Sequence, residues 1–145
     1  MIKRIVVTCL SAVTCLSLLS ATGAEKDKPS VQIDASKLPP ALDKKDVTYT
    51  ADVKPLFEKS CVKCHGAEKP KGKLRLDSLE GILKGGEDGK VVTPGKSTES
   101  MLIANIAHLG DPDDYMPPPK NKAGIQPLTK EEIGLVRAWI DQGAK

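Results

Sequence analysis

One cysteine pair constrains the fold of this chain more than any other feature of its sequence. Cys61 and Cys64 are separated by two residues, and His65 follows directly. The other two cysteines, Cys9 and Cys15, lie in an apolar N-terminal stretch. Two thiols on one turn of chain can bond the same planar group, and the imidazole beside them can bind its metal from one face. A domain that carries this motif has to fold around the planar, metal-containing group that these three side chains can bind.

The pattern C-x-x-C-H is the attachment signature of c-type haem. Each thiol can add across one haem vinyl group, and His65 can then bind the iron from the proximal side. A zinc site would need four ligands, and beyond residue 24 the chain holds two cysteines and two histidines in all. A thioredoxin-like redox pair requires a βαβ context, and a plain disulfide leaves the histidine unexplained. We therefore expect one covalently attached haem c, held by Cys61, Cys64 and His65.

The first 24 residues have the organisation of a secretory signal peptide. Lys3 and Arg4 precede an apolar run over residues 5–21, and Ala24 supplies a small residue just before Glu25. The run is 17 residues long, the lower limit for a bilayer span, so an uncleaved anchor is the alternative. We expect cleavage, export to the periplasm or another compartment outside the cytoplasm, and no stable membrane span afterwards.

Charge excludes one class of function and suggests a kind of partner. Removal of residues 1–24 takes away two of the 22 basic residues and none of the 19 acidic ones, which leaves a net charge of +1. Such a balance does not favour binding to nucleic acid. Residues 61–76 nevertheless carry a net charge of +4, because they contain five basic residues and one acidic residue, Glu68. This basic rim could steer redox partner proteins with an acidic docking surface, or it could be an ordinary solvated lysine face; Arg75 could instead pair with a haem propionate.

Residues 25–47 show no sustained hydrophobic period and predict an irregular N-terminal linker, so the domain is expected to cover residues 48–145. No alternating run in the domain predicts a strand. The hydrophobic spacing predicts an all-α body whose short helices are joined by long loops. The expected helix caps are Asp52 before the motif, Asp77 with Glu80 for a helix that stops at Gly85, Ser97, and Thr129 with Glu132.

The last helix has the clearest signals. Thr129 and Glu132 predict a capping box at its start, and Gly143 predicts its end. Its expected buried stripe consists of Ile133, Val136, Trp139 and Ile140.

An electron carrier needs a second axial ligand, because fixed coordination keeps the iron geometry similar in both oxidation states. Met116 is the main candidate, since it lies in an irregular, proline-rich loop that can present a thioether stiffly. Met101 falls on the apolar side of an expected helix, where core packing is its ordinary role. His108 lies at the end of that helix, where a partly exposed histidine is usual. Met101 and His108 remain the alternatives if Met116 is not the ligand.

The order of these motifs resembles the class I cytochrome c fold, and more narrowly the planctomycete-type cytochrome c domain. The resemblance covers residues 48–145 and rests on the C-x-x-C-H motif, Met116-Pro117-Pro118, the Leu74-Arg75-Leu76-Asp77 run and the Trp139-Ile140-Asp141-Gln142-Gly143-Ala144 end. It implies a class I cytochrome c-like fold around one haem, axial ligation by His65 and Met116, and packing of the first helix against the last. Such domains are often fused to larger extracellular modules, and a chain that ends just after the domain is expected to be a free-standing carrier.

Two classes of function follow from the sequence. The first is an electron-transfer protein that is not an enzyme, with both axial positions of the iron filled. The second is a haem enzyme or gas sensor with an open sixth position. The sequence gives little support to the second class, because an enzyme would need acid–base residues and His108 is the one histidine outside the motif. The spectrum of the oxidised protein would distinguish them.

Overall fold

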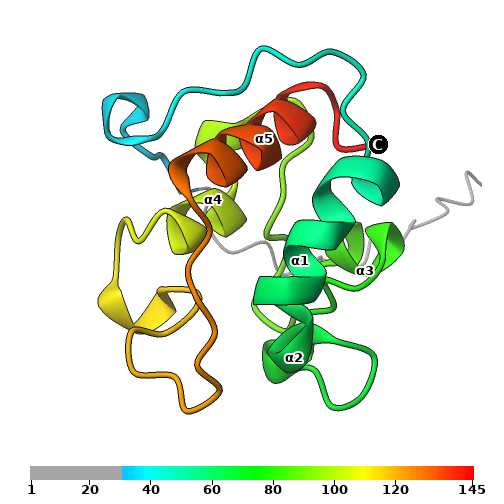
Figure 1. The fold of residues 1–145 in the computed structure, drawn as a ribbon, viewed down its shortest axis with the longest axis vertical. Coiled ribbons are helices and arrows are strands. Elements are labelled where there is room, and N and C mark those ends of the chain that lie inside the picture. The colour runs from blue at the N-terminus through cyan, green and yellow to red at the C-terminus, as the bar shows by residue number, and fades with distance from the viewer. Residues whose placement is uncertain (1–30) are drawn as a thin grey trace, which may run out of the picture.

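The computed structural model describes residues 31–145, so the expected signal peptide lies outside the described part of the chain. Within that part, short helical elements follow one another with irregular chain between them (Figure 1). The α-helices are α1 (Lys54–Ser60), α2 (Val62–His65), α3 (Leu79–Lys84), α4 (Met101–Ile106) and α5 (Lys130–Asp141). A π-helical turn, η2 (Tyr49–Val53), leads into α1, and the short 3-10 turns are η1 (Ala35–Lys37), η3 (Lys71–Lys73), η4 (Ser97–Glu99) and η5 (Pro112–Asp114).

No strand occurs between residues 31 and 145, where one isolated antiparallel bridge joins Gly86 and Gly89. The prediction of an all-α fold is confirmed. In Figure 1, α5 crosses one end of the molecule above α4, and α1 and α2 run down one side. The long chain segment between α4 and α5, coloured yellow to orange, runs down the opposite side. None of the helices formed by residues 31–145 is long and apolar enough to cross a membrane.

α5 forms as its sequence predicts. Thr129 accepts a hydrogen bond from the Glu132 backbone, and the Glu132 carboxylate accepts one from the Thr129 backbone, so the capping box is complete. The helix ends at Asp141, and Gly143 follows with a φ of 100°. The predicted stripe is buried throughout, at Ile133, Val136, Trp139 and Ile140.

Three other predicted caps, those at Asp52, Asp77 and Ser97, are wrong. Thr48 caps the helical segment that leads to the cysteine motif in place of Asp52, and the Thr48 backbone N–H donates to the Asp52 carboxylate at 2.9 Å. Ser78 caps α3 in place of Asp77.

Ser97 caps no α-helix. Its hydroxyl donates to the Asp141 carboxylate of α5 at 3.0 Å, and α4 begins after Ser100. In each of these regions several side chains capable of capping stand within a few residues of one another, and the predicted caps Asp52, Asp77 and Ser97 have other partners, which are Lys44, Arg75 and Asp141.

The first and last helical segments meet at an aromatic cluster, as the family resemblance implies. The Tyr49 ring lies 6.5 Å from the Phe57 ring and 6.1 Å from the Trp139 ring, measured between centroids. The Tyr49 N–H and the Trp139 indole N–H both donate to the backbone oxygen of Lys145, at 2.8 and 2.9 Å. This cluster ties the end of the chain to the segment that leads into the cysteine motif.

Residues 31–47, which we call the strap, are largely irregular and lie along α5 (Figure 1). Three of its apolar side chains are buried, those of Ile33, Leu38 and Val47. Backbone and side-chain hydrogen bonds fasten it: Leu42 N–H to the Gly134 oxygen at 3.0 Å, Arg137 to the Pro39 oxygen, Gln142 to the Lys44 oxygen at 2.7 Å, and Ile33 N–H to the Thr98 oxygen at 2.9 Å. The strap is therefore an integral part of the described structure.

Candidate functional site

The cysteine motif occupies the junction between two short helices. α1 ends at Ser60, Cys61 has a non-helical φ of −127°, and α2 carries Cys64 and His65. The N–H groups of Cys64 and His65 both donate to the Cys61 carbonyl, at 3.0 and 2.9 Å. This tight turn brings the two free thiols and the imidazole to the wall of one cavity.

Two adjoining cavities surround the motif. The first has a volume of about 400 Å³ and is bordered by Cys61, Cys64 and His65; the second has about 550 Å³ and is also bordered by His65. Both volumes lie in the range of about 300–1,000 Å³ that cofactor and ligand sites occupy. The two cavities share six lining residues: His65, Lys71, Leu74, Val91, Asn105 and Met116.

The Nδ1 side of the His65 ring contacts the backbone, so Nε2 is the ring atom that could bind a metal. Its Nδ1 lies 3.2 Å from the Leu74 carbonyl oxygen, to which Nδ1–H can donate, and its backbone oxygen accepts from Leu76 N–H at 2.8 Å. The side chain is buried, and this burial lowers the pKa of His65. A neutral imidazole whose Nδ1 carries the proton leaves the Nε2 lone pair free for a metal.

Met116 reaches the same two cavities from a distant part of the chain. Its half-buried side chain borders both, and its N–H donates to the Asn105 carbonyl of α4 at 3.0 Å. The bond between Met116 and Pro117 is cis, and Pro117 is buried against the first cavity. The fold thus brings a thioether and an imidazole to one space.

The alternative ligands are placed differently. Met101 borders the second cavity but not the first. His108 borders neither; its ring stacks on Tyr115, with centroids 4.7 Å apart and planes at 1°, and its Nε2 is buried without a hydrogen bond. Arg75 also borders neither cavity, because its guanidinium binds both carboxylate oxygens of Asp77 at 3.0 and 2.8 Å. The idea that Arg75 pairs with a haem propionate gains no support from this arrangement.

The chemistry of the donor set fits haem c. Cys61 and Cys64 are free, and burial, with a smaller contribution from Cys64, raises the pKa of Cys61 to about 12. The thiols stand beside a cavity whose walls are mainly aliphatic, which suits a large planar apolar group. These aliphatic and proline side chains are Leu74, Leu76, Val91, Leu102, Ile106, Pro117, Pro118, Ala123 and Ile125. Across residues 31–145, no group of three or more His, Cys, Asp or Glu side chains is arranged to hold a metal ion, as a zinc site would need.

Sequence reasoning missed several residues of the site. Asn105 lies four positions after Met101 on α4, a spacing that places both on one helix face, but its polar side chain did not fit an apolar pattern. Lys120 and Lys122 border the first cavity across from Lys71. They lie far from the basic segment 61–76 in sequence, and no local pattern connects them with it.

A helical body with free cysteines and an imidazole on the wall of an apolar cavity defines a c-type cytochrome domain, whose cofactor is haem c. Residues 61–120 match the family model described as Planctomycete cytochrome C, so this segment is a planctomycete-type cytochrome c domain. The matched segment contains Cys61, Cys64, His65 and Met116. No curated protein and no solved structure matches the chain.

Proposed function

We propose that this domain is a monohaem electron carrier in which His65 and Met116 are the two axial ligands of the iron. The observation that carries the proposal is that both side chains border both cavities, while Cys61 and Cys64 border the first. Bound haem c supplies the exchange of single electrons between Fe(II) and Fe(III). The single C-x-x-C-H motif of the sequence supports one haem.

The role of the protein is to hold two unlike donors in fixed positions. The Leu74 carbonyl orients the imidazole of His65, and the Asn105 carbonyl anchors the backbone of Met116. A thioether opposite an imidazole raises the reduction potential relative to two imidazoles. With both axial positions occupied, the domain transfers electrons without binding a substrate at the iron, which separates it from a haem enzyme or gas sensor.

The optical spectrum of the oxidised holoprotein tests this ligation. We expect a weak band at the red end, from sulfur-to-iron charge transfer, that disappears in Met116→Ala together with a fall in the midpoint potential. Met101→Ala is the matched control, because Met101 borders only the second cavity, and it should keep the band. High-spin features without the band in the unmodified protein would instead favour an open iron and the enzyme or sensor function.

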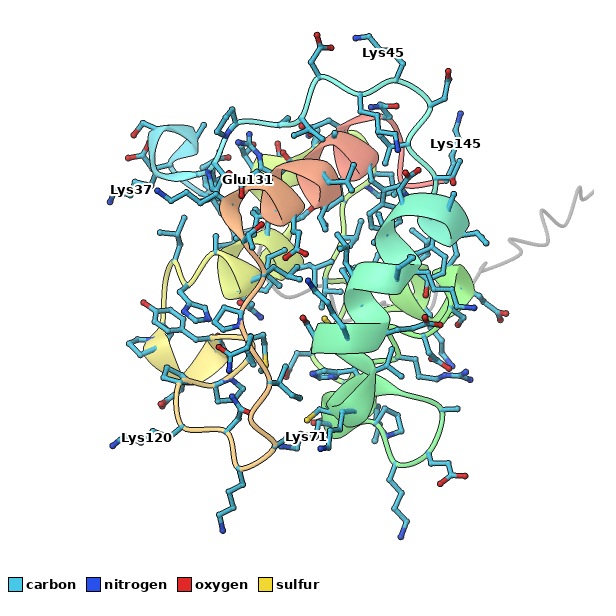
Figure 2. All side chains as sticks on the ribbon, viewed as in Figure 1. Lys37, Lys45, Lys71, Lys120, Glu131 and Lys145 are labelled. Atoms are coloured by element: carbon cyan, nitrogen blue, oxygen red, sulfur yellow. The ribbon has the colours of Figure 1, made fainter. Side chains whose placement is uncertain are left out.

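We further propose that acidic redox partners dock at the mouth of the first cavity. Lys71, Lys120 and Lys122 are exposed there, and none of the three forms an ion pair within residues 31–145. Figure 2 shows Lys71 and Lys120 at one end of the molecule and Lys45 at the other. Positive side chains around the cofactor edge would attract a negative surface and orient it.

Electron exchange with hexacyanoferrate, a small anionic reagent, tests the lysine surface. We expect the rate to fall steeply with salt, and to fall at low salt in the double variant Lys120→Gln/Lys122→Gln. Lys45→Gln is the control, since Lys45 lies far from this end of the molecule (Figure 2). A rate that is independent of salt and of both lysines would contradict the docking proposal.

The leader and its export are part of the proposal. Haem c is attached outside the cytoplasm, and the order of basic, apolar and small residues in positions 1–24 supports a cleaved signal peptide. Mass spectrometry of protein from a host that attaches haem c should give the mass of residues 25–145 plus one haem. A mass that includes residues 1–24 would show that the leader is retained.

A further inference from the structure

The segment from Leu74 to Leu76 contacts His65 at two points. The Leu74 carbonyl oxygen lies 3.2 Å from His65 Nδ1, and the Leu76 N–H donates to the His65 backbone oxygen at 2.8 Å. The first contact fixes the imidazole ring, and the second fixes the backbone that carries it. A shift of this segment would therefore alter both the orientation of the ring and the hydrogen bond from its Nδ1–H.

The hydroxyl of Tyr49 holds the same segment at its other end. It donates to the Leu76 carbonyl oxygen at 3.0 Å, and the side chains of Tyr49 and Leu76 are buried, at 4% and 3% exposure. A hydrogen bond buried in this way is costly to leave unmade. Leu76 is thus bound from two directions, with its N–H on His65 and its carbonyl on Tyr49.

Tyr49 takes its own position from the contact between the first and last helical segments. Its N–H donates to the backbone oxygen of Lys145 at 2.8 Å, and its ring lies beside those of Phe57 in α1 and Trp139 in α5. The Trp139 indole N–H donates to the same Lys145 oxygen at 2.9 Å. The phenol therefore joins this interface, which lies outside the cavities, to the segment that contacts His65.

We propose that Tyr49 is a positioning residue for the proximal ligand His65. Its hydroxyl fixes the Leu76 carbonyl and so keeps the Leu74 carbonyl, two residues earlier, in place to accept the imidazole Nδ1–H. A firmly accepted Nδ1–H makes the imidazole a stronger donor, which favours the oxidised iron. This inference rests on the proposed ligation of the iron by His65.

The midpoint potential and the NMR resonance of His65 Nδ1–H, both measured on the holoprotein, test this role. Tyr49→Phe keeps the ring and removes the hydroxyl. We expect the midpoint potential to rise and the Nδ1–H resonance of the reduced protein to move upfield, because the bond to the Leu74 carbonyl weakens.

Thr129→Ala is the matched control for this experiment. It should lower stability by a similar amount through the cap of α5, and it should leave the potential and the Nδ1–H resonance unchanged. If Tyr49→Phe also leaves both quantities unchanged, the hydroxyl does not position His65 and the proposal is overturned.

Hydrogen exchange in the unmodified holoprotein keeps the proposal testable if Tyr49→Phe does not fold. If Tyr49 and Leu76 hold the ring in place, His65 Nδ1–H should exchange with solvent only when the segment opens. Its exchange rate should then depend on urea as steeply as that of the Leu76 N–H. A rate that is faster and independent of urea would mean that the ring is released by itself, and would overturn the proposal.

The outcomes separate this proposal from the proposed function. In the reduced holoprotein, His65 ring protons without the ring-current shift of a bound haem would show that His65 is not an axial ligand, and both proposals would fail. If those protons are shifted but Tyr49→Phe alters neither the potential nor the Nδ1–H resonance, only the role of Tyr49 fails.

Discussion

Replacing Gly134 by alanine brings two physical effects into opposition. Gly134 lies inside α5, where alanine is favoured over glycine by about 1 kcal/mol because it restricts the unfolded chain and suits the helix. A Cβ atom at this position would lie 2.5 Å from the Pro40 carbonyl oxygen of the strap. Helix propensity alone therefore predicts stabilisation, whereas the packing of the strap predicts the reverse.

The packing effect should be the larger. The Pro40 oxygen belongs to the backbone, so the strap itself must move by about 1 Å to reach an ordinary contact distance. Overpacking of this kind costs about 1–3 kcal/mol, and loss of the 3.0 Å bond from Leu42 N–H to the Gly134 oxygen adds about 1 kcal/mol. After the propensity gain is subtracted, we expect Gly134→Ala to lower the free energy of unfolding by about 1–3 kcal/mol.

Urea denaturation of the holoprotein measures this change, and limited trypsin digestion locates it. Cleavage after Lys37 and Lys44 of the strap should accelerate in Gly134→Ala. Glu131→Ala is the control in the same helix; Glu131 is exposed, so its replacement should alter stability by less than about 0.5 kcal/mol. An increase in stability, with unchanged digestion of the strap, would refute the reasoning.

Two further predictions concern the aromatic cluster and α5. Burial raises the pKa of Tyr49 to about 12 in the folded protein, whereas the pKa of tyrosine in the unfolded chain is about 10. The neutral phenol therefore contributes fully to folding stability below pH 10, and this contribution is lost as the pH rises from 10 to 12. Stability measured by urea titration should fall more steeply over that range in the unmodified protein than in Tyr49→Phe, and equal slopes would contradict the shift. At neutral pH, Tyr49→Phe should cost about 1 kcal/mol, because the Leu76 carbonyl loses its 3.0 Å donor. Thr129→Ala should cost about 1 kcal/mol by removing the capping bond to Glu132; an unchanged urea midpoint would mean that the box does not stabilise α5.

The sequence predicted correctly those features of the fold that depend on side chains close together in the chain. The capping box at Thr129 and Glu132 and the apolar stripe of α5 are of this kind, and both form as expected. The caps at Asp52 and Asp77 were predicted wrongly, because Thr48 and Ser78 stand close enough to compete with them. In the second case, the ion pair with Arg75 engages the Asp77 carboxylate.

The strap could not be recognised from its sequence. Its hydrogen bonds to α5 run largely through its own backbone oxygens and N–H groups, which every residue has and which impose no periodic pattern. Its buried side chains are spaced too irregularly to suggest a helix or strand. The partner that gives the segment its conformation lies about 90 residues further along the chain, at Gly134 and Arg137.

By itself, the sequence determined the chemistry of the site, because the reactive groups of Cys61, Cys64 and His65 act within one turn of chain and their spacing alone specifies haem attachment. Only the tertiary structure decided which other residues lie beside the cavities that His65 borders. Met116 and Asn105 lie at the cavities that His65 borders, and lysines from two distant segments border the first of them. Arg75 binds Asp77 and borders neither cavity. The physical reason is that such contacts depend on how loops and helices far apart in the chain pack together, and no local pattern records that packing.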